Sequence, residues 1–141
     1  MADNSARAQS LYDAWEKRDF DSFAKQFADG VSFNDVPRGE IVTGNDNVRD
    51  WYASWATAFP DSTAGATVMA ASGDTVAIEG LLVGTNTGDF GPVPPTGRSI
   101  SVPWANFLRF DAEGRVIGGT AYYDQLSLMI QLGLMQPPAA T

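Results

Sequence analysis

The spacing of apolar residues changes along the chain near Pro60, and this change limits the folds that the chain can adopt. Before Pro60, apolar residues mainly recur every three or four positions, as in a helix with one buried face. After it they mainly alternate, as in a strand with one buried face. The predicted helices cover residues 5–18, 19–29, 46–59 and 125–132, and the predicted strands cover residues 31–36, 67–71, 75–84, 99–110 and 115–123.

This order of elements predicts an α+β fold in which the N-terminal helices pack on one face of a strongly curved antiparallel β-sheet. Turn signals at residues 72–74 and 111–114 separate the later strands, and residues 41–42 begin a small hairpin arm. Residues 87–97 are rich in Gly and Pro and predict an ordered loop. A curved sheet covered by helices forms a cone around a pocket. The length of 141 residues favours one domain over residues 1–141.

The chain contains no His and no Cys. This composition excludes zinc sites built from thiolates and imidazoles, haem attachment, and Ser-His-Asp or Cys-His catalysis. Proton transfer near neutral pH must then use carboxylates, Tyr or Lys. We therefore expect no metal site and look for catalytic residues among these side chains.

The net charge is -8, from 9 basic and 17 acidic residues. A surface of this charge repels nucleic acid and anionic membranes, so neither is an expected partner. No segment approaches the roughly 20 apolar residues that cross a bilayer. Residues 1–5 carry no basic region followed by an apolar stretch, which predicts that there is no signal peptide. The expected location is the cytoplasm.

Several short motifs carry a resemblance to known proteins. Residues 27–35 (Phe-Ala-Asp-Gly-Val-Ser-Phe-Asn-Asp) resemble the second helix and first strand of the NTF2-like superfamily. The second half of the chain resembles the SnoaL-like polyketide (ester) cyclase family of that superfamily. The motifs concerned are Gly88-Asp89-Phe90-Gly91, Pro94-Pro95-Thr96-Gly97-Arg98, Ser101-Val102-Pro103, Phe107-Leu108-Arg109-Phe110, Asp124-Gln125-Leu126 and Gln131-Leu132-Gly133-Leu134.

The resemblance implies an NTF2-like cone and a reaction without a cofactor. Cyclases of this family close a ring by an intramolecular aldol reaction, in which an acidic carbon loses a proton and the enolate is stabilised. A carboxylate and a hydrogen-bond donor suffice for this chemistry. Typical members carry a Glu-His-Trp-like stretch followed by an acidic residue, where this chain has Gly118-Gly119-Thr120 and Ala121. A His of aromatic-polyketide cyclases falls near Asn106.

Asp35 is the first candidate catalytic residue. It shares a strand face with Val31 and Phe33, so its carboxylate is expected to point inward. Its position resembles that of the general base of ketosteroid isomerases, another branch of the superfamily. The alternative is a structural carboxylate at the pocket rim, or one that caps the turn at residues 37–39.

Asn106 is the second candidate, on one strand face with Trp104 and Leu108. Its side-chain amide can donate a hydrogen bond to a developing oxyanion without any adjustment of pKa. The alternative is a structural Asn that satisfies backbone groups. Asp124 is the third candidate, because it is the only carboxylate near the end of the last strand. Its position directly before the last helix favours a capping role instead.

The aromatic residues supply candidate substrate contacts. Their helical spacing fits a packed core, yet four Trp in so small a domain also suit a pocket for a flat, polycyclic ligand. The candidate substrate-binding residues are Tyr12, Trp15, Trp55, Trp104 and Tyr123.

These candidates favour a cyclase or isomerase of polyketide-type secondary metabolism, with Asp35 as base and Asn106 as stabiliser of the enolate. The expected substrate is small and hydrophobic. Epoxide opening or an auxiliary role in polyketide hydroxylation is one alternative, and a non-catalytic binding domain is another. Apolar residues on the outer sheet face would support a homodimer.

Overall fold

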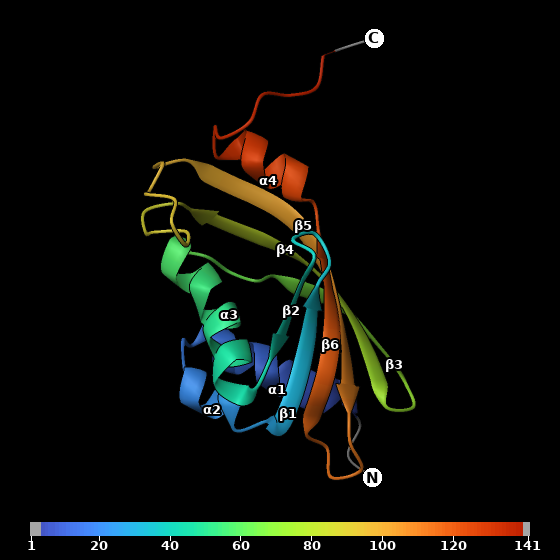
Figure 1. Cartoon of the computed structure of the whole chain (residues 1–141). Coiled ribbons are helices and arrows are strands. Elements are labelled where there is room, and N and C mark those ends of the chain that lie inside the picture. The colour runs from blue at the N-terminus through green and yellow to red at the C-terminus, as the bar shows by residue number, and fades with distance from the viewer. Residues whose placement is uncertain (1–3, 140–141) are drawn as a thin grey trace.

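The computed structural model describes residues 4–139, and its elements follow the predicted order (Figure 1). The predictions for residues 1–3 and 140–141 fall outside the described residues. The helices are α1 (Asn4–Glu16), α2 (Phe20–Ala24), α3 (Asn45–Ala58) and α4 (Gln125–Gln131). The strands are β1 (Phe27–Asp35), β2 (Glu40–Thr43), β3 (Ala66–Ser72), β4 (Thr75–Thr85), β5 (Ser99–Phe110) and β6 (Val116–Tyr123). The predicted α+β fold class is confirmed.

The six strands form one sheet in the order β2-β1-β6-β5-β4-β3. Every neighbouring pair is antiparallel except β1 and β6, which run parallel. The sheet is therefore mixed, and the prediction of a purely antiparallel sheet was wrong in this one pairing. Alternating apolar residues identify a strand but carry no information on its direction, which is set here by the long connection through α3.

Helices α1, α2 and α3 lie within the curve of the sheet, and α4 lies beside β5 at the top of the view (Figure 1). Helix α1 packs against β3 and β4, α3 packs against β1 and β2, and α4 packs against β5 near the opposite end. The core between these layers is rich in aromatic rings, including Phe23, Phe33 and Phe59, which are almost completely buried. The sheet and helices together therefore enclose the space in which a cavity can form.

The second helix is shorter than the predicted segment 19–29. It begins after Asp19, whose carboxylate accepts a hydrogen bond from Ser22 N, and it ends at Ala24. Phe27 follows Phe23 by four positions, as on one face of a helix, and the centroids of the two rings are 5.0 Å apart. Its backbone nevertheless pairs with Val116 of β6, so Phe27 begins β1. Pairing across the sheet has overridden a local helical pattern.

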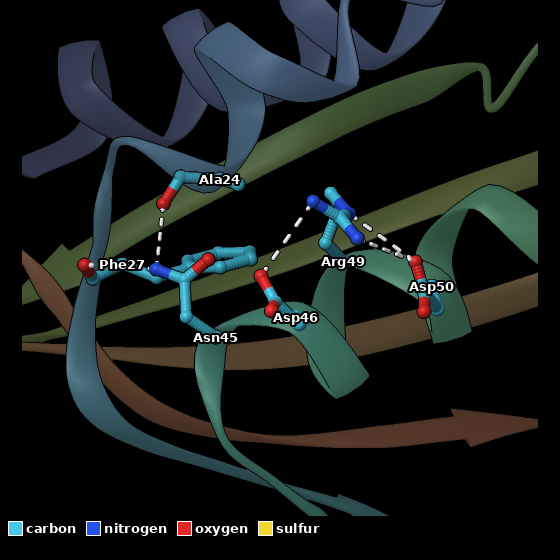
Figure 2. A network of polar contacts seen from close by, with 6 residues as sticks. All are labelled: Ala24, Phe27, Asn45, Asp46, Arg49 and Asp50. Carbon is cyan, nitrogen blue, oxygen red and sulfur yellow. Dashed lines mark hydrogen bonds and ion pairs between the residues drawn. The ribbon is translucent and has the colours of Figure 1, made fainter.

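Helix α3 is fixed to the junction between α2 and β1 by one side chain (Figure 2). Asn45 Nδ2 donates to the carbonyl oxygens of Ala24 at 2.9 Å and of Phe27 at 3.4 Å. Gly44, with φ 96°, turns the chain into the helix without a side-chain cap. These contacts set the position of α3, which carries several of the aromatic side chains described below.

The loop predicted over residues 87–97 is ordered around the buried side chain of Asn86. Its Nδ2 donates to the carbonyls of Ala58 and Gly88, and its Oδ1 accepts hydrogen bonds from the backbone and hydroxyl of Thr96. The loop carries Phe90 against Trp55, with ring centroids 5.2 Å apart. A single buried amide thus holds this loop beside α3.

Candidate functional site

A cavity lies between the helices and the sheet, and we call it the inner cavity. Its volume is about 70 Å³. Six predicted site residues line it, namely Tyr12, Trp15, Trp55, Trp104, Asn106 and Tyr123. The remaining lining residues are Trp51, Tyr52, Ala64, Leu82, Val102 and Ala121. The structure therefore brings together most of the predicted residues in one aromatic pocket.

Trp51 and Tyr52 are lining residues that the sequence prediction did not select as site residues. The helical pattern of residues 46–59 places one of these neighbours on the buried stripe but does not show which. In the structure Tyr52 is buried and Trp51 partly buried, and both reach the cavity from α3. The dense aromatic run around position 51 is the signal that could have identified them.

Asp35 and Asn106 lie in one row across the sheet. Both residues pair with Ala121 of β6, Asp35 from β1 and Asn106 from β5. Adjacent strands are about 4.8 Å apart, so the backbones of the two residues are separated by roughly 10 Å. All three residues are buried, with the small side chain of Ala121 between the two polar ones. A substrate above Ala121 would have a polar group on each side.

The carboxylate of Asp35 is buried and held by several donors. Tyr123 Oη donates to Oδ1 at 2.8 Å, and Trp51 Nε1 donates to Oδ2 at 2.9 Å. The Arg38 backbone N–H donates to Oδ1 at 3.4 Å, and Arg38 Nε lies 3.8 Å from Oδ2. Asp35 does not itself line the inner cavity, whereas Tyr123 and Trp51 do. Its inward orientation agrees with the prediction, but it meets the cavity through other side chains.

Tyr123 connects Asp35 to the cavity. Burial raises the pKa of the Tyr123 phenol well above its usual value, and the hydrogen bond to Asp35 and the charge of that carboxylate raise it further. The positive charge of Arg38 has the opposite effect and lowers the pKa of Tyr123. The phenol therefore stays protonated at neutral pH and donates to the carboxylate. Its oxygen can still accept a proton or hydrogen bond from a ligand.

The side-chain amide of Asn106 donates hydrogen bonds to two phenols at the inner cavity. Its Nδ2 donates to Tyr12 Oη at 2.6 Å and to Tyr52 Oη at 3.3 Å. Burial raises the pKa of Tyr12 to about 12 and that of Tyr52 well above 10. The two phenols also interact with each other, and this interaction raises the pKa of Tyr52.

This arrangement allows Tyr12 to donate a hydrogen bond to a ligand. The Tyr12 oxygen accepts from Asn106, and this contact does not use its own O–H. The Tyr12 ring stacks on Trp104 at a centroid distance of 5.3 Å, which fixes its direction. A phenol that accepts a hydrogen bond is polarised and becomes a stronger donor. The oxyanion-stabilising role predicted for Asn106 would therefore be exerted through Tyr12.

Asp124 has the alternative role that its sequence position favoured. Its carboxylate accepts a hydrogen bond from Ser127 N at 2.9 Å and caps α4. It is exposed and is not among the residues lining the inner cavity. Its geometry supplies a helix cap, so Asp35 is the carboxylate near this cavity.

The glycines in place of the Glu-His-Trp-like stretch are required by packing. A Cβ on Gly119 would lie 2.5 Å from Phe33 Cε1 and 2.7 Å from the Phe107 carbonyl oxygen. A Cβ on Gly118 would lie 2.9 Å from the Ser32 carbonyl oxygen. Phe33 is 1% exposed and fills the space beside Gly119. A side chain at position 119 would therefore overlap a buried ring and the backbone of β5.

Comparisons with known proteins agree with this architecture. The family model for the SnoaL-like polyketide cyclase matches residues 6–132. A candidate SnoaL-like polyketide cyclase from Jannaschia sp. CCS1 has a TM-score of 0.84 and 22% identity, covering 95% of this chain and 93% of its own. AclR, a candidate hydroxylase from Streptomyces galilaeus, has a TM-score of 0.81 and 22% identity. The match covers 95% of this chain and 87% of AclR.

A third solved structure is IdmH, a candidate polyketide cyclase from Streptomyces antibioticus. It has a TM-score of 0.77 and 24% identity, with coverage of 94% of this chain and 99% of that one. At these identities the solved structures establish the shared fold. A search of curated proteins finds no match. Within residues 4–139, no helix is both long enough and apolar enough to cross a membrane.

Proposed function

Because the chain belongs to the SnoaL-like polyketide cyclase family, we propose that it catalyses a cofactor-independent cyclisation or isomerisation of a small, hydrophobic, polyketide-like molecule. The observation that carries the proposal is the pair of polar clusters at the inner cavity. Asp35 and Tyr123 form one cluster, and Asn106, Tyr12 and Tyr52 form the other. A strand position occupied by Ala121 separates them.

The first step is removal of a proton from a carbon next to a carbonyl group. The Tyr123 oxygen takes this proton while its own hydrogen passes to Asp35 Oδ1, along the existing hydrogen bond of 2.8 Å. The C–H bond breaks, the carboxylate becomes neutral, and the negative charge moves to the substrate as an enolate. Asp35 thus acts as the base and Tyr123 carries the proton.

The second cluster stabilises the enolate. Tyr12 donates its hydrogen to the enolate oxygen, and the amide of Asn106 donates to the phenol oxygen. In a cyclisation, the enolate carbon attacks a second carbonyl of the same molecule, and the resulting alkoxide receives the proton held by Asp35 through Tyr123. In an isomerisation, the same proton returns to a different carbon. Both routes restore the starting enzyme.

A non-catalytic binding domain is the second candidate. The observation that favours it is the set of donors to Asp35, both of whose oxygens already accept hydrogen bonds without any ligand. Such a domain would bind flat hydrophobic molecules in the inner cavity and leave their C–H bonds unchanged. The two candidates differ in whether the bound molecule exchanges protons with the protein.

The deciding experiment follows deuterium exchange by NMR at the acidic carbon of 1-(2-naphthyl)butane-1,3-dione, a β-diketone. Acceleration by the protein, lost in Asp35→Asn and in Asn106→Ala, supports the enzyme. The matched control is Asp124→Asn, because Asn also caps helices and this residue is outside the cavity. If the two site variants retain full activity, this mechanism is wrong. Binding without acceleration favours the second candidate.

The outer sheet face supports a proposal of homodimer formation. Exposed apolar side chains follow β4, β5 and β6 on this face, namely Leu81, Val83, Phe107, Ile117 and Tyr122. A surface of this kind is typical of an interface between protein chains. Light scattering after size-exclusion chromatography measures the mass, and Phe107→Asp is expected to give a monomer. An unchanged mass for this variant would remove the proposed interface.

A further inference from the structure

A second hollow adjoins the inner cavity, and we call it the outer groove. Its volume is about 320 Å³, which is larger than the 70 Å³ or so of the inner cavity. Its walls come from the turn after β1, from α3, from the loop around Phe90 and from α4. Apolar side chains such as Leu128 and Met129 share these walls with Arg38, Glu40 and Gln125. The groove is thus amphipathic.

The boundary between the two spaces is formed by Arg38 and two aromatic rings. The guanidinium carbon lies 5.3 Å from the centroid of Trp55, which lines the inner cavity, and 5.1 Å from that of Phe90, which lines the outer groove. The Arg38 side chain is 25% exposed. A molecule that extends from one space to the other must pass beside this guanidinium.

Arg38 has unused donor capacity. Its Nε faces Asp35, while its two terminal nitrogens make no hydrogen bond or ion pair with residues 4–139. A guanidinium held over aromatic rings with free N–H groups is suited to bind an oxygen acceptor. Arg38 can therefore donate to an oxygen atom of a ligand at the mouth of the inner cavity.

The outer groove also contains two acceptors. Gln125 Oε1 is buried and has no hydrogen-bond partner among the described residues. The carboxylate of Glu40 lies in the same wall. A buried acceptor without a partner is costly, and a ligand hydroxyl would satisfy it. These acceptors favour a hydroxyl group at the ligand end that occupies the groove.

The local charge decides between a neutral and an anionic ligand. Asp35 already offsets the charge of Arg38, Glu40 adds a second carboxylate, and the whole chain has a net charge of -8. A ligand carboxylate in the groove would be repelled by Glu40 and gain little from a guanidinium that is already paired. A neutral carbonyl oxygen meets no such repulsion.

We propose that the substrate is an elongated, uncharged molecule with a flat ring system in the inner cavity and a hydroxy-carbonyl chain in the outer groove. Arg38 donates to the carbonyl oxygen, and Gln125 accepts from the hydroxyl. Arg38 is then a specificity-determining residue for the length and charge of the substrate. This inference rests on the proposed function only in naming the bound molecule a substrate.

The test is a binding measurement with three related compounds. They are methyl 3-hydroxy-4-(2-naphthyl)butanoate, its free carboxylate, and 2-methylnaphthalene, which has the ring alone. Calorimetry at pH 7 is expected to show the ester binding at least about tenfold more tightly than 2-methylnaphthalene, as for one or two net hydrogen bonds. The ester is also expected to bind more tightly than the carboxylate.

Two variants assign the contacts. Arg38→Met and Gln125→Leu should each reduce the advantage of the ester over 2-methylnaphthalene roughly three- to tenfold. Arg115→Met is the matched control, because Arg115 is exposed and pairs with Asp111 at the turn between β5 and β6. Thermal unfolding checks that each variant is folded. The comparison of compounds on the unmodified protein requires no variant.

Several results would overturn the proposal. They are equal binding of all three compounds, no binding of any, tighter or equal binding of the carboxylate, or an unchanged ester advantage in folded Arg38→Met. The measurement is independent of catalysis. If Asp35→Asn leaves proton exchange intact while the ester preference persists, the proposed function fails and the groove assignment stands.

Discussion

Tyr123 donates its phenolic hydrogen to Asp35 Oδ1 over 2.8 Å while its ring forms part of the wall of the inner cavity. The carboxylate therefore lies one side chain behind the surface that a ligand would touch. A base in this position is shielded from water and from direct contact with the substrate. Its chemistry depends on the phenol that stands between.

Replacing Tyr123 with Phe should lower the rate of carbon-proton exchange by about 10²- to 10³-fold, because the ring remains but the proton carrier is lost. Tyr122→Phe is the matched control, since Tyr122 is the adjacent residue and is exposed on the outer face. The double variant with Asp35→Asn should be little slower than either single variant. Independent, multiplying effects of the two changes would contradict transfer through Tyr123.

The phenol pair offers a second comparison. Tyr12→Phe removes the donor proposed for the enolate oxygen and should lower the exchange rate by about 10²-fold or more. Tyr52→Phe removes contacts with Asn106 and Tyr12 but keeps the proposed donor, so it should have a smaller effect. Both variants keep the rings that line the cavity, so ligand affinity should change little. An equal loss of exchange rate in both variants would show that Tyr12 is not the main donor to the enolate oxygen.

Alkaline pH should destabilise the protein through the same phenols. The pKa of Tyr12 is about 12 in the folded protein and 10.0 is its ordinary value, so the unfolded chain ionises first. The stabilisation by the neutral phenol is complete below pH 10 and is lost as the pH rises toward 12. The free energy of unfolding should fall by about 1.4 kcal/mol per pH unit for this group.

Urea unfolding between pH 9 and 11.5 measures this slope. Tyr12→Phe should reduce the slope in this window, because one titrating group has been removed. A slope that is the same in Tyr12→Phe as in the unmodified protein would contradict the raised pKa of Tyr12.

Gly119→Ala should destabilise the protein by about 1–3 kcal/mol, because the added methyl group overlaps the Phe33 ring and the Phe107 carbonyl. Gly30→Ala is the control in another strand, since a Cβ there meets nothing within 4 Å. Phe33→Leu in the Gly119→Ala background should recover part of the loss. Chemical denaturation gives all four free energies. A Gly119→Ala variant as stable as the original would show that β6 shifts to accommodate the methyl group.

The sequence predicted the order of elements because each helix or strand has a local apolar period. It missed the end of α2 and the direction of β1 because both depend on pairing with β6, about 90 residues away. Of the pocket residues on strands, Trp104, Asn106 and Tyr123 were predicted, from alternation together with the family resemblance. Trp51 was not selected, since its approach to Asp35 depends on how α3 is anchored by Asn45.

The polar contacts of the site were less predictable than its composition. An inward Asp35 follows from its strand face, but its shielding by Tyr123 joins residues 88 positions apart. Asn106 was chosen for its amide, yet its partners Tyr12 and Tyr52 come from two helices. Such contacts are set by how the layers pack, and the local sequence does not encode their pairing.

All four tryptophans of the chain line the inner cavity. Trp15 and Trp104 donate their indole N–H groups to backbone carbonyls at 3.0 Å and 2.7 Å, and Trp51 donates to Asp35. The tryptophan fluorescence of the protein therefore originates entirely from the walls of this one space. A ligand in the inner cavity should therefore change the tryptophan fluorescence of the unlabelled protein. Extracts and compound libraries can be screened by this fluorescence change before any reaction is known.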